Sequence, residues 1–247
     1  MTTLDKYRTS LSLNNKALWL MQRGRCDDAL QVLKDSSTLL KDASYGSEST
    51  MEETSVRKML DRASIQCVQV DDRASTTRNN SGIQVVETDE DDLWVLQEIA
   101  LKGLSSSAVH MVRMSACTNS EDDFVTISRQ FASLCYNKGV ACIMAQAKNE
   151  SFLPSSVKDD SLFDDALYNF RIAERTLSAL VDMDGEDVAL VLIHALVLRS
   201  LGALYKQIGL KSQARETMRT VSFLCRNLEE EMEYAFAPQE PKSAVAA

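Results

Sequence analysis

Apolar residues recur every three to four positions through most of the chain. This spacing places them on one side of an α-helix and predicts amphipathic helices. Glycines lie between the first two and between the last two of these stretches, at Gly24 and Gly209, so we expect a turn at each. The predicted helices cover, in chain order, residues 11–21, 27–40, 121–147, 160–181, 188–208 and 212–234.

Residues 41–92 do not follow the helical pattern. They hold 12 acidic, 6 basic and 12 Ser or Thr residues, a composition that buries too little apolar surface to offset the entropy of ordering the chain. Three β-rich runs in and after this segment are consistent with a small antiparallel sheet. They are Ile65–Val70, Ile83–Val86 and Ala108–Met114, and Leu93–Ile99 fits either a strand or a short helix.

These patterns divide the chain into four parts. Residues 1–42 form a first helical hairpin, and residues 43–120 form an acidic, Ser/Thr-rich insertion that is partly disordered. Residues 121–236 form two further hairpins, with a loop inserted at 148–160. Residues 237–247 form a disordered tail.

The three predicted hairpins share a pattern of small and large residues. A small residue in the first helix is followed three positions later by a larger one, and a second small residue stands in the next helix, where it lets two helices approach closely. These positions are Ala17, Leu20 and Ala29, then Gly139, Cys142 and Ala166, then Gly202, Tyr205 and Ala214.

This pattern resembles the tetratricopeptide repeat, and the layout is similar to that of repeat proteins from diatom-type algae. The two small residues are 12 positions apart in the first and third units, as that family requires, and 27 apart in the middle unit. The resemblance implies a mostly α fold in which antiparallel helical hairpins stack as a short solenoid. It covers residues 10–40 and about 124–235.

Composition and charge narrow the function classes. Glycine (8 of 247 residues) and proline (3) are scarce, which argues against an all-β fold and a glycine-rich nucleotide-binding fold. The net charge of −9 disfavours nonspecific nucleic-acid binding. No apolar run reaches ~18 residues and the start lacks a signal-peptide pattern, so we expect no membrane partner and a cytoplasmic or nuclear location.

The residues that carry most enzyme chemistry are few. His194 lies in an apolar helix and fits a structural role, and His110 lies on a predicted strand. The six cysteines form no C-x-x-C pair and fit small core residues. Asp89–Asp92 lacks the other ligands and the turning glycine of a Ca²⁺ loop. We therefore expect no catalytic residue, no metal and no cofactor.

Repeat proteins of the resembled family bind extended peptides in a groove lined by the first helix of each hairpin. Asn side chains suit such a groove because each offers a donor and an acceptor to peptide backbone. Few cations fall in it, which argues against clamping of a terminal carboxylate. The resemblance implies these groove residues: Asn14, Leu18, Met21, Gln22, Tyr136, Asn137, Val140, Met144, Arg199, Ala203 and Lys206.

The function predicted from these features is a non-enzymatic adaptor or scaffold that binds a protein or peptide on its concave helical face. Two other functions stay open: a small hydrolase or transferase that uses His110, and a regulatory or structural subunit phosphorylated in its acidic insertion. A further alternative concerns the groove itself, which residues 41–120 would fill in cis.

Overall fold

The fold is mostly helical, as the periodicity predicts. The computed structural model describes residues 2–44, 53–71, 83–86, 109–114, 124–152, 161–183 and 187–236. Helices make up about nine-tenths of this described part. The seven helices are α1 (Thr3–Gln22), α2 (Cys26–Ser44), α3 (Glu53–Asp71), α5 (Phe124–Phe152), α6 (Ser161–Met183), α7 (Val188–Gln207) and α8 (Lys211–Phe236), and the two strands are β1 (Ile83–Val86) and β2 (Val109–Val112).

Local sequence signals set several helix ends. Thr2 and Asp5 form a reciprocal capping box at the start of α1, with the Thr2 hydroxyl accepting from the Asp5 backbone N–H at 3.1 Å. The Asp187 carboxylate caps α7 by accepting from the Leu190 N–H. Gly24 and Gly209 follow α1 and α7 with φ of +72° and +85°. These left-handed conformations favour glycine, and they let the chain reverse into α2 and α8.

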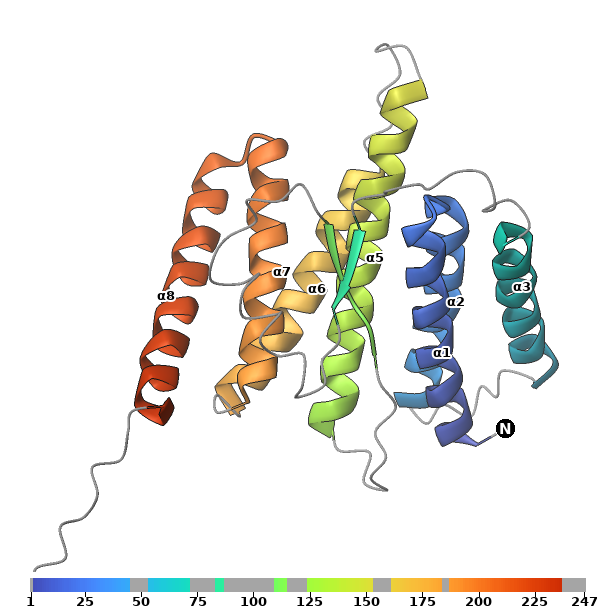
Figure 1. The fold of residues 1–247 in the computed structure, drawn as a ribbon, viewed down its shortest axis with the longest axis horizontal. Coiled ribbons are helices and arrows are strands. Elements are labelled where there is room, and N and C mark those ends of the chain that lie inside the picture. Colours follow the sequence, from blue (N-terminus) through green and yellow to red (C-terminus); the bar gives the residue numbers. More distant parts are fainter. Residues whose placement is uncertain are drawn as a thin grey trace, which may run out of the picture.

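The helices stand side by side in a row. Figure 1 shows them from α3 at one end, through α1 and α2, to α5, α6, α7 and α8 at the other. Each helix packs most extensively against its neighbours in this row, so α1 pairs with α2, α5 with α6, and α7 with α8. From α5 onward each helix therefore packs on the next one along the chain, whereas α3 packs mainly on α1 and α5 packs on α2.

Part of the predicted acidic insertion is helical. The run Ile65–Val70, predicted as a strand, lies within α3, so that prediction is wrong. A run of six residues is too short for its period to separate strand from helix. Here the helix begins at Glu53, where Val56 and Ala63 are buried against the first hairpin, and it continues through the β-rich run.

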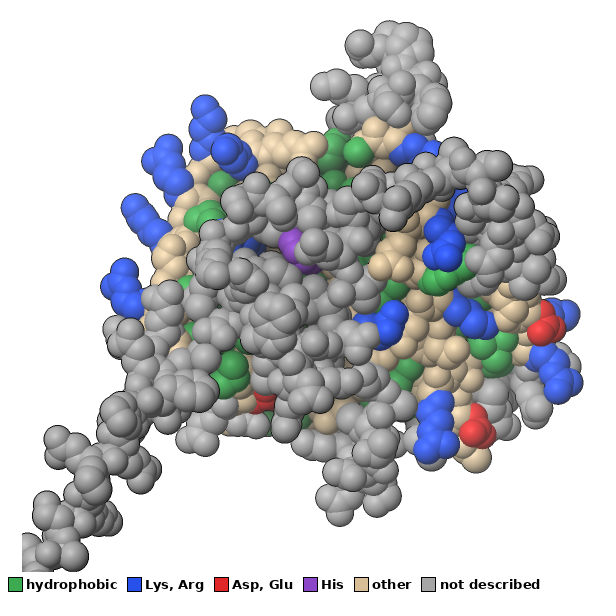
Figure 2. All heavy atoms as spheres, in the orientation of Figure 1, with side chains coloured by type: hydrophobic (Ala, Val, Ile, Leu, Met, Phe, Trp, Pro, Cys, Tyr) green, Lys and Arg blue, Asp and Glu red, His purple; other side chains and the backbone are tan. Residues whose placement is uncertain are grey.

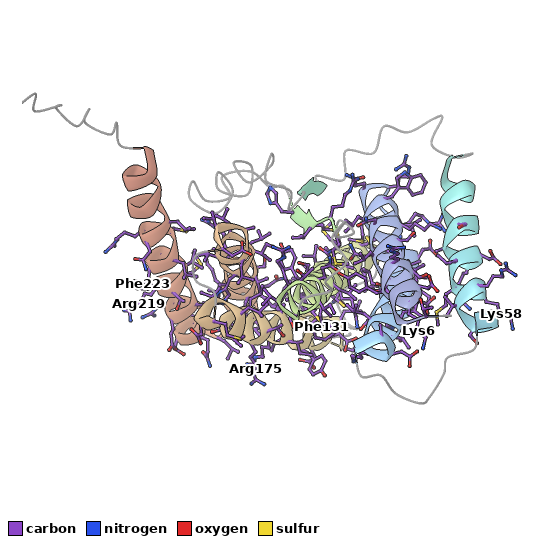
Figure 3. All side chains as sticks on the ribbon, turned by 90° about the horizontal axis from the view of Figure 1, so that it is seen from below. Lys6, Lys58, Phe131, Arg175, Arg219 and Phe223 are labelled. Atoms are coloured by element: carbon purple, nitrogen blue, oxygen red, sulfur yellow. The ribbon has the colours of Figure 1, made fainter. Side chains whose placement is uncertain are left out.

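The other two β-rich runs pair, but not in the predicted orientation. β1 and β2 are parallel, with Ile83 opposite Val109 and Val86 opposite Val112, so the antiparallel prediction is wrong. A parallel pair needs a connection of a dozen or more residues, and residues 87–108 provide it. The pair contacts α1 and α5 and lies on one side of the helical row (Figure 3). We call this side the strand face.

Several predicted segments fall partly or wholly outside the described residues. These include Leu93–Ile99, Asp89–Asp92, the tail 237–247 and most of the predicted loop 148–160. The first residues of that loop are helical, because α5 continues to Phe152.

The helix α7 forms the centre of one half of the core. Among the described residues it is the one helix long and apolar enough to cross a membrane, although its apolar run is interrupted by His194. However, 78% of its apolar window is buried against other parts of the protein. Its apolar side chains are thus mostly packed inside the protein.

Candidate functional site

Asn137 of α5 binds the main chain of β2 on the strand face. Its Oδ1 accepts from the Val112 N–H at 2.9 Å, and its Nδ2 donates to the Val112 carbonyl at 2.7 Å. The same Nδ2 donates to Asn14 Oδ1 at 3.0 Å. Both asparagines are fully buried. One amide side chain thus satisfies both backbone groups of an extended residue, as its donor and acceptor allow.

Two more side chains hold the same segment at alternate residues. Asn15 of α1 donates to the Met114 carbonyl at 2.8 Å and accepts from the Met114 N–H at 3.2 Å. The Tyr136 hydroxyl of α5 donates to the His110 carbonyl at 3.0 Å. Residues 110, 112 and 114 are therefore bound through their main chain by α1 and α5, and the segment occupies this part of the strand face in cis.

The groove residues implied by the resemblance divide into separate places. Asn14, Tyr136 and Asn137 lie under the segment 109–114, whereas Leu18 and Met21 are buried in the core. Gln22 and Met144 are half-buried. The others line a pocket next to the segment, together with Tyr136: they are Val140, Arg199, Ala203 and Lys206.

An open pocket lies beside the strand segment. It has a volume of about 1090 Å³, and its described walls come from α5, α7 and α8, with His110 of β2 and Phe170 of α6. Apolar side chains such as Val140, Leu196 and Met218 form much of its lining. The volume lies just above the usual range for small-molecule sites, about 300–1000 Å³, and is large enough for part of a peptide.

The sequence analysis missed the contribution of α8 to this pocket. Four cations of α8 line it, in addition to the predicted Arg199 and Lys206: Lys211, Arg215, Arg219 and Arg226. The expectation of few cations in the groove is therefore wrong. It assigned the lining to the first helix of each hairpin alone, whereas the second helix of the last hairpin also borders the pocket. The spacing of Lys211, Arg215 and Arg219 at every fourth position was the available signal.

The two histidines have different surroundings. His110 is buried at the pocket wall, and burial lowers its pKa. None of the described residues that line the pocket is an Asp, a Glu or a Cys, so they provide His110 with neither a carboxylate nor a thiol for acid–base or nucleophilic chemistry. His194 lies in the core on α7, and burial lowers its pKa to about 4.

The buried cysteines are poorly suited to act as nucleophiles or as metal ligands. Burial raises the pKa of Cys135 to about 12 and that of Cys142 to about 11, and it also raises the pKa of Cys26. These thiols are free and protonated at neutral pH, as expected of small core residues. Within the described ranges, no group of three or more His, Cys, Asp or Glu residues is placed to hold a metal ion.

Comparison with known proteins gives no relative: no family model, no curated protein and no solved structure matches this chain.

Proposed function

We propose that this protein is a tetratricopeptide-repeat-like stack of three helical hairpins. What supports the proposal is the order of packing along the row, α1–α2, α2–α5, α5–α6, α6–α7 and α7–α8. The small residues of the repeat pattern support it too, because all are buried between helices: Ala17, Ala29, Gly139, Ala166, Gly202 and Ala214.

We further propose that the protein works as a non-enzymatic adaptor or scaffold that binds a segment of another protein in the pocket of α5, α7 and α8. The observation that carries this proposal is the recognition of extended main chain by Asn15, Tyr136 and Asn137 on the same face. A surface that already holds one extended segment through its backbone has the chemistry for peptide binding, and the pocket lies directly beside it.

The cis segment limits where a partner binds. Residues 109–114 occupy the α1–α5 part of the strand face, so a partner engages the part formed by α5, α7 and α8. This favours the alternative in which the chain fills its own groove, but only in the half formed by α1 and α5. The partner would then bind in the pocket of the other half.

Photo-crosslinking from inside the pocket tests this function. Ala203 lines the pocket and is exposed, so it tolerates replacement by p-benzoylphenylalanine. Tyr168 on α6 is 64% exposed and does not line the pocket, so the same replacement there is the matched control. We expect a defined crosslinked partner from position 203 in cell extract and none from position 168. Identical products from both positions, or none from position 203, would rule the proposal out.

A further inference from the structure

Six cations of α7 and α8 line the pocket. Arg199 and Lys206 come from α7, and Lys211, Arg215, Arg219 and Arg226 come from α8. We call these six residues the α8 basic surface. Figure 2 shows Lys and Arg side chains gathered along the edge of the molecule that α8 forms. A concentrated basic surface is unexpected in a chain with a net charge of −9.

Five of the six cations, all but Arg199, form no ion pair with a residue in the described part of the protein. The described residues that line the pocket include no Asp or Glu. Within those ranges, no carboxylate lies within 4 Å of Lys206, Lys211, Arg215, Arg219 or Arg226, although other cations do form ion pairs, such as Arg129 with Asp187 at 3.3 Å. These five like charges repel one another, and an anionic ligand relieves that repulsion.

Large apolar side chains lie among the cations. Phe223 is 61% exposed and Met218 is 37% exposed, and both line the same pocket. Figure 3 shows Arg219 and Phe223 together on α8. A large exposed apolar residue within a charged surface is typical of a protein-binding site, where it provides buried contact area. The ligand is therefore expected to be both acidic and apolar, which a protein segment satisfies better than a nucleic acid does.

At the end of the row, α8 has no described helix on the side away from α7. The second helix of each earlier hairpin is covered by the next helix: α5 packs on α2, and α7 packs on α6. In the described part of the chain, α8 packs extensively against α7 alone. The chain's last residues, 237–247, hold one Glu and one Lys, so they do not match six cations in charge.

The spacing of the cations fits an extended peptide. Lys211, Arg215 and Arg219 follow one another at four-residue intervals, about 6 Å along the helix axis. Side chains on one side of an extended chain are about 6.6 Å apart, because alternate residues share a side. From Lys211 to Arg226 the distance along α8 is about 22 Å, the length of about seven extended residues.

We propose that the α8 basic surface binds an extended acidic segment of a partner protein, with carboxylates at alternate residues and a large apolar residue against Met218 and Phe223. Arg guanidinium groups bind carboxylates through paired hydrogen bonds, which gives such a segment its register. This inference rests on the proposed function, and it adds the chemical class of the partner.

A charge-reversal experiment with a defined probe tests the inference. The probe is a fluorescent nine-residue peptide with glutamate at every second position and a central phenylalanine, and its affinity for the full chain is measured by anisotropy. The test variant is Arg215→Glu with Arg219→Glu. The matched control is Lys58→Glu with Arg175→Glu, which makes the same change in net charge at exposed residues of α3 and α6, outside the pocket.

We expect the test variant to bind the probe at least about tenfold more weakly and the control to bind it as the natural chain does. A second peptide with lysine in place of glutamate should bind the test variant better than the natural chain. Phe223→Ala should further lower the affinity for the glutamate peptide. Equal loss in test and control variants, or equal binding of both peptides to the natural chain, would overturn the inference.

Other occupants give different results. If a single-stranded RNA of 12 nucleotides binds more tightly than the peptide and is lost in the test variant, the surface is a nucleic-acid site and the inference is wrong. If the peptide binds only after Glu87 and Asp89–Asp92 are neutralised, the chain's own acidic segment is the occupant and the inference is again wrong. If position 203 crosslinks a partner equally in the charge-reversed chain, the proposed function stands and only the acidic partner class fails.

Discussion

His194 is a buried, uncharged group whose surroundings decide how the protein responds to acid. It is 5% exposed, and neither of its ring nitrogens has a hydrogen-bond partner among the described residues. Burial lowers its pKa from 6.5 to about 4. The unfolded chain therefore takes up a proton near pH 6.5, whereas the folded chain does so only near pH 4.

This difference predicts a loss of stability on acidification. As the pH falls from 6.5 toward 4, the free energy of unfolding should decrease because the unfolded state binds more protons. The His194 contribution to this loss should reach about 2 kcal/mol at pH 4.5. Urea unfolding at pH 7.5 and pH 4.5 measures it. His194→Leu should lose correspondingly less stability over this range, and an equal loss in both proteins would contradict the assignment.

Gly139 is required by the close approach of α5 and α6. A Cβ atom at this position would lie 2.5 Å from a ring carbon of Phe170, a distance at which one of the two must move. Phe170 is itself fixed, because it is fully buried and packs on Tyr136 with ring centroids 5.7 Å apart. The repeat pattern therefore requires glycine at this position because any side chain would clash with the Phe170 ring.

Gly139→Ala should lower the free energy of unfolding by about 1–3 kcal/mol, the range for overpacking a core. Gly202→Ala is the control, because its Cβ would meet the flexible end of Met218 at 3.2 Å, which can move. In the double variant with Phe170→Leu, the cost should be smaller than the sum of the two single changes. Thermal and urea unfolding measure the loss of stability in each single and double variant. Additive losses would show that the Phe170 ring is not the cause of the Gly139→Ala destabilisation.

At the scale of elements, the segment 109–114 is held to the helices by its buried apolar side chains and by helix side chains that bind its backbone. The amides of Val112 and Met114 donate to Asn137 and Asn15, respectively. Asn15→Ala should therefore speed hydrogen exchange at the Met114 amide and leave the Val112 amide protected. Asn137→Ala should expose the Val112 amide and cost about 1–3 kcal/mol, because buried groups lose their partners. Unchanged exchange at both amides would contradict the binding described.

Most helices and the positions of both strands were predictable from the sequence, whereas the pairing of the strands was not. A long helix such as α6 shows its period over more than five turns, and β1 and β2 lie within β-rich runs, but a run of four residues carries no signal for the orientation of its partner strand. The parallel pairing of β2 with β1 depends on contacts between segments far apart in sequence. The β-rich end of α3 was misread because helix propagation from Glu53 outweighs local β propensity.

The candidate site was predictable in part for a similar reason. Asn14 and Asn137 were singled out as suited to peptide backbone, and Asn137 binds the backbone of β2. The periodic cations of α8 were visible in the sequence, but that they border a pocket with α5 and α7 depends on how these helices pack together. That property belongs to the whole arrangement of helices and to no single segment.

At the scale of the molecule, the row predicts uneven stability. α8 packs extensively against one described neighbour, whereas α5 and α6 are covered on both sides. Amides of α8 should therefore exchange at least about tenfold faster than those of α6 under native conditions, through local opening from the end of the row. Hydrogen exchange followed by mass spectrometry measures this. Equal protection in both helices would show that the molecule opens as one unit.

The segment bound by Asn15, Tyr136 and Asn137 is part of the same chain as the helices that hold it. Met114 and Phe124 are ten positions apart, so they are never more than about 36 Å from each other. This tether gives the segment an effective concentration in the millimolar range. A free peptide would have to exceed that concentration, or bind far more tightly, to replace it. Because the bound segment is covalently tethered, free peptides of any sequence compete poorly for the α1–α5 half of the strand face.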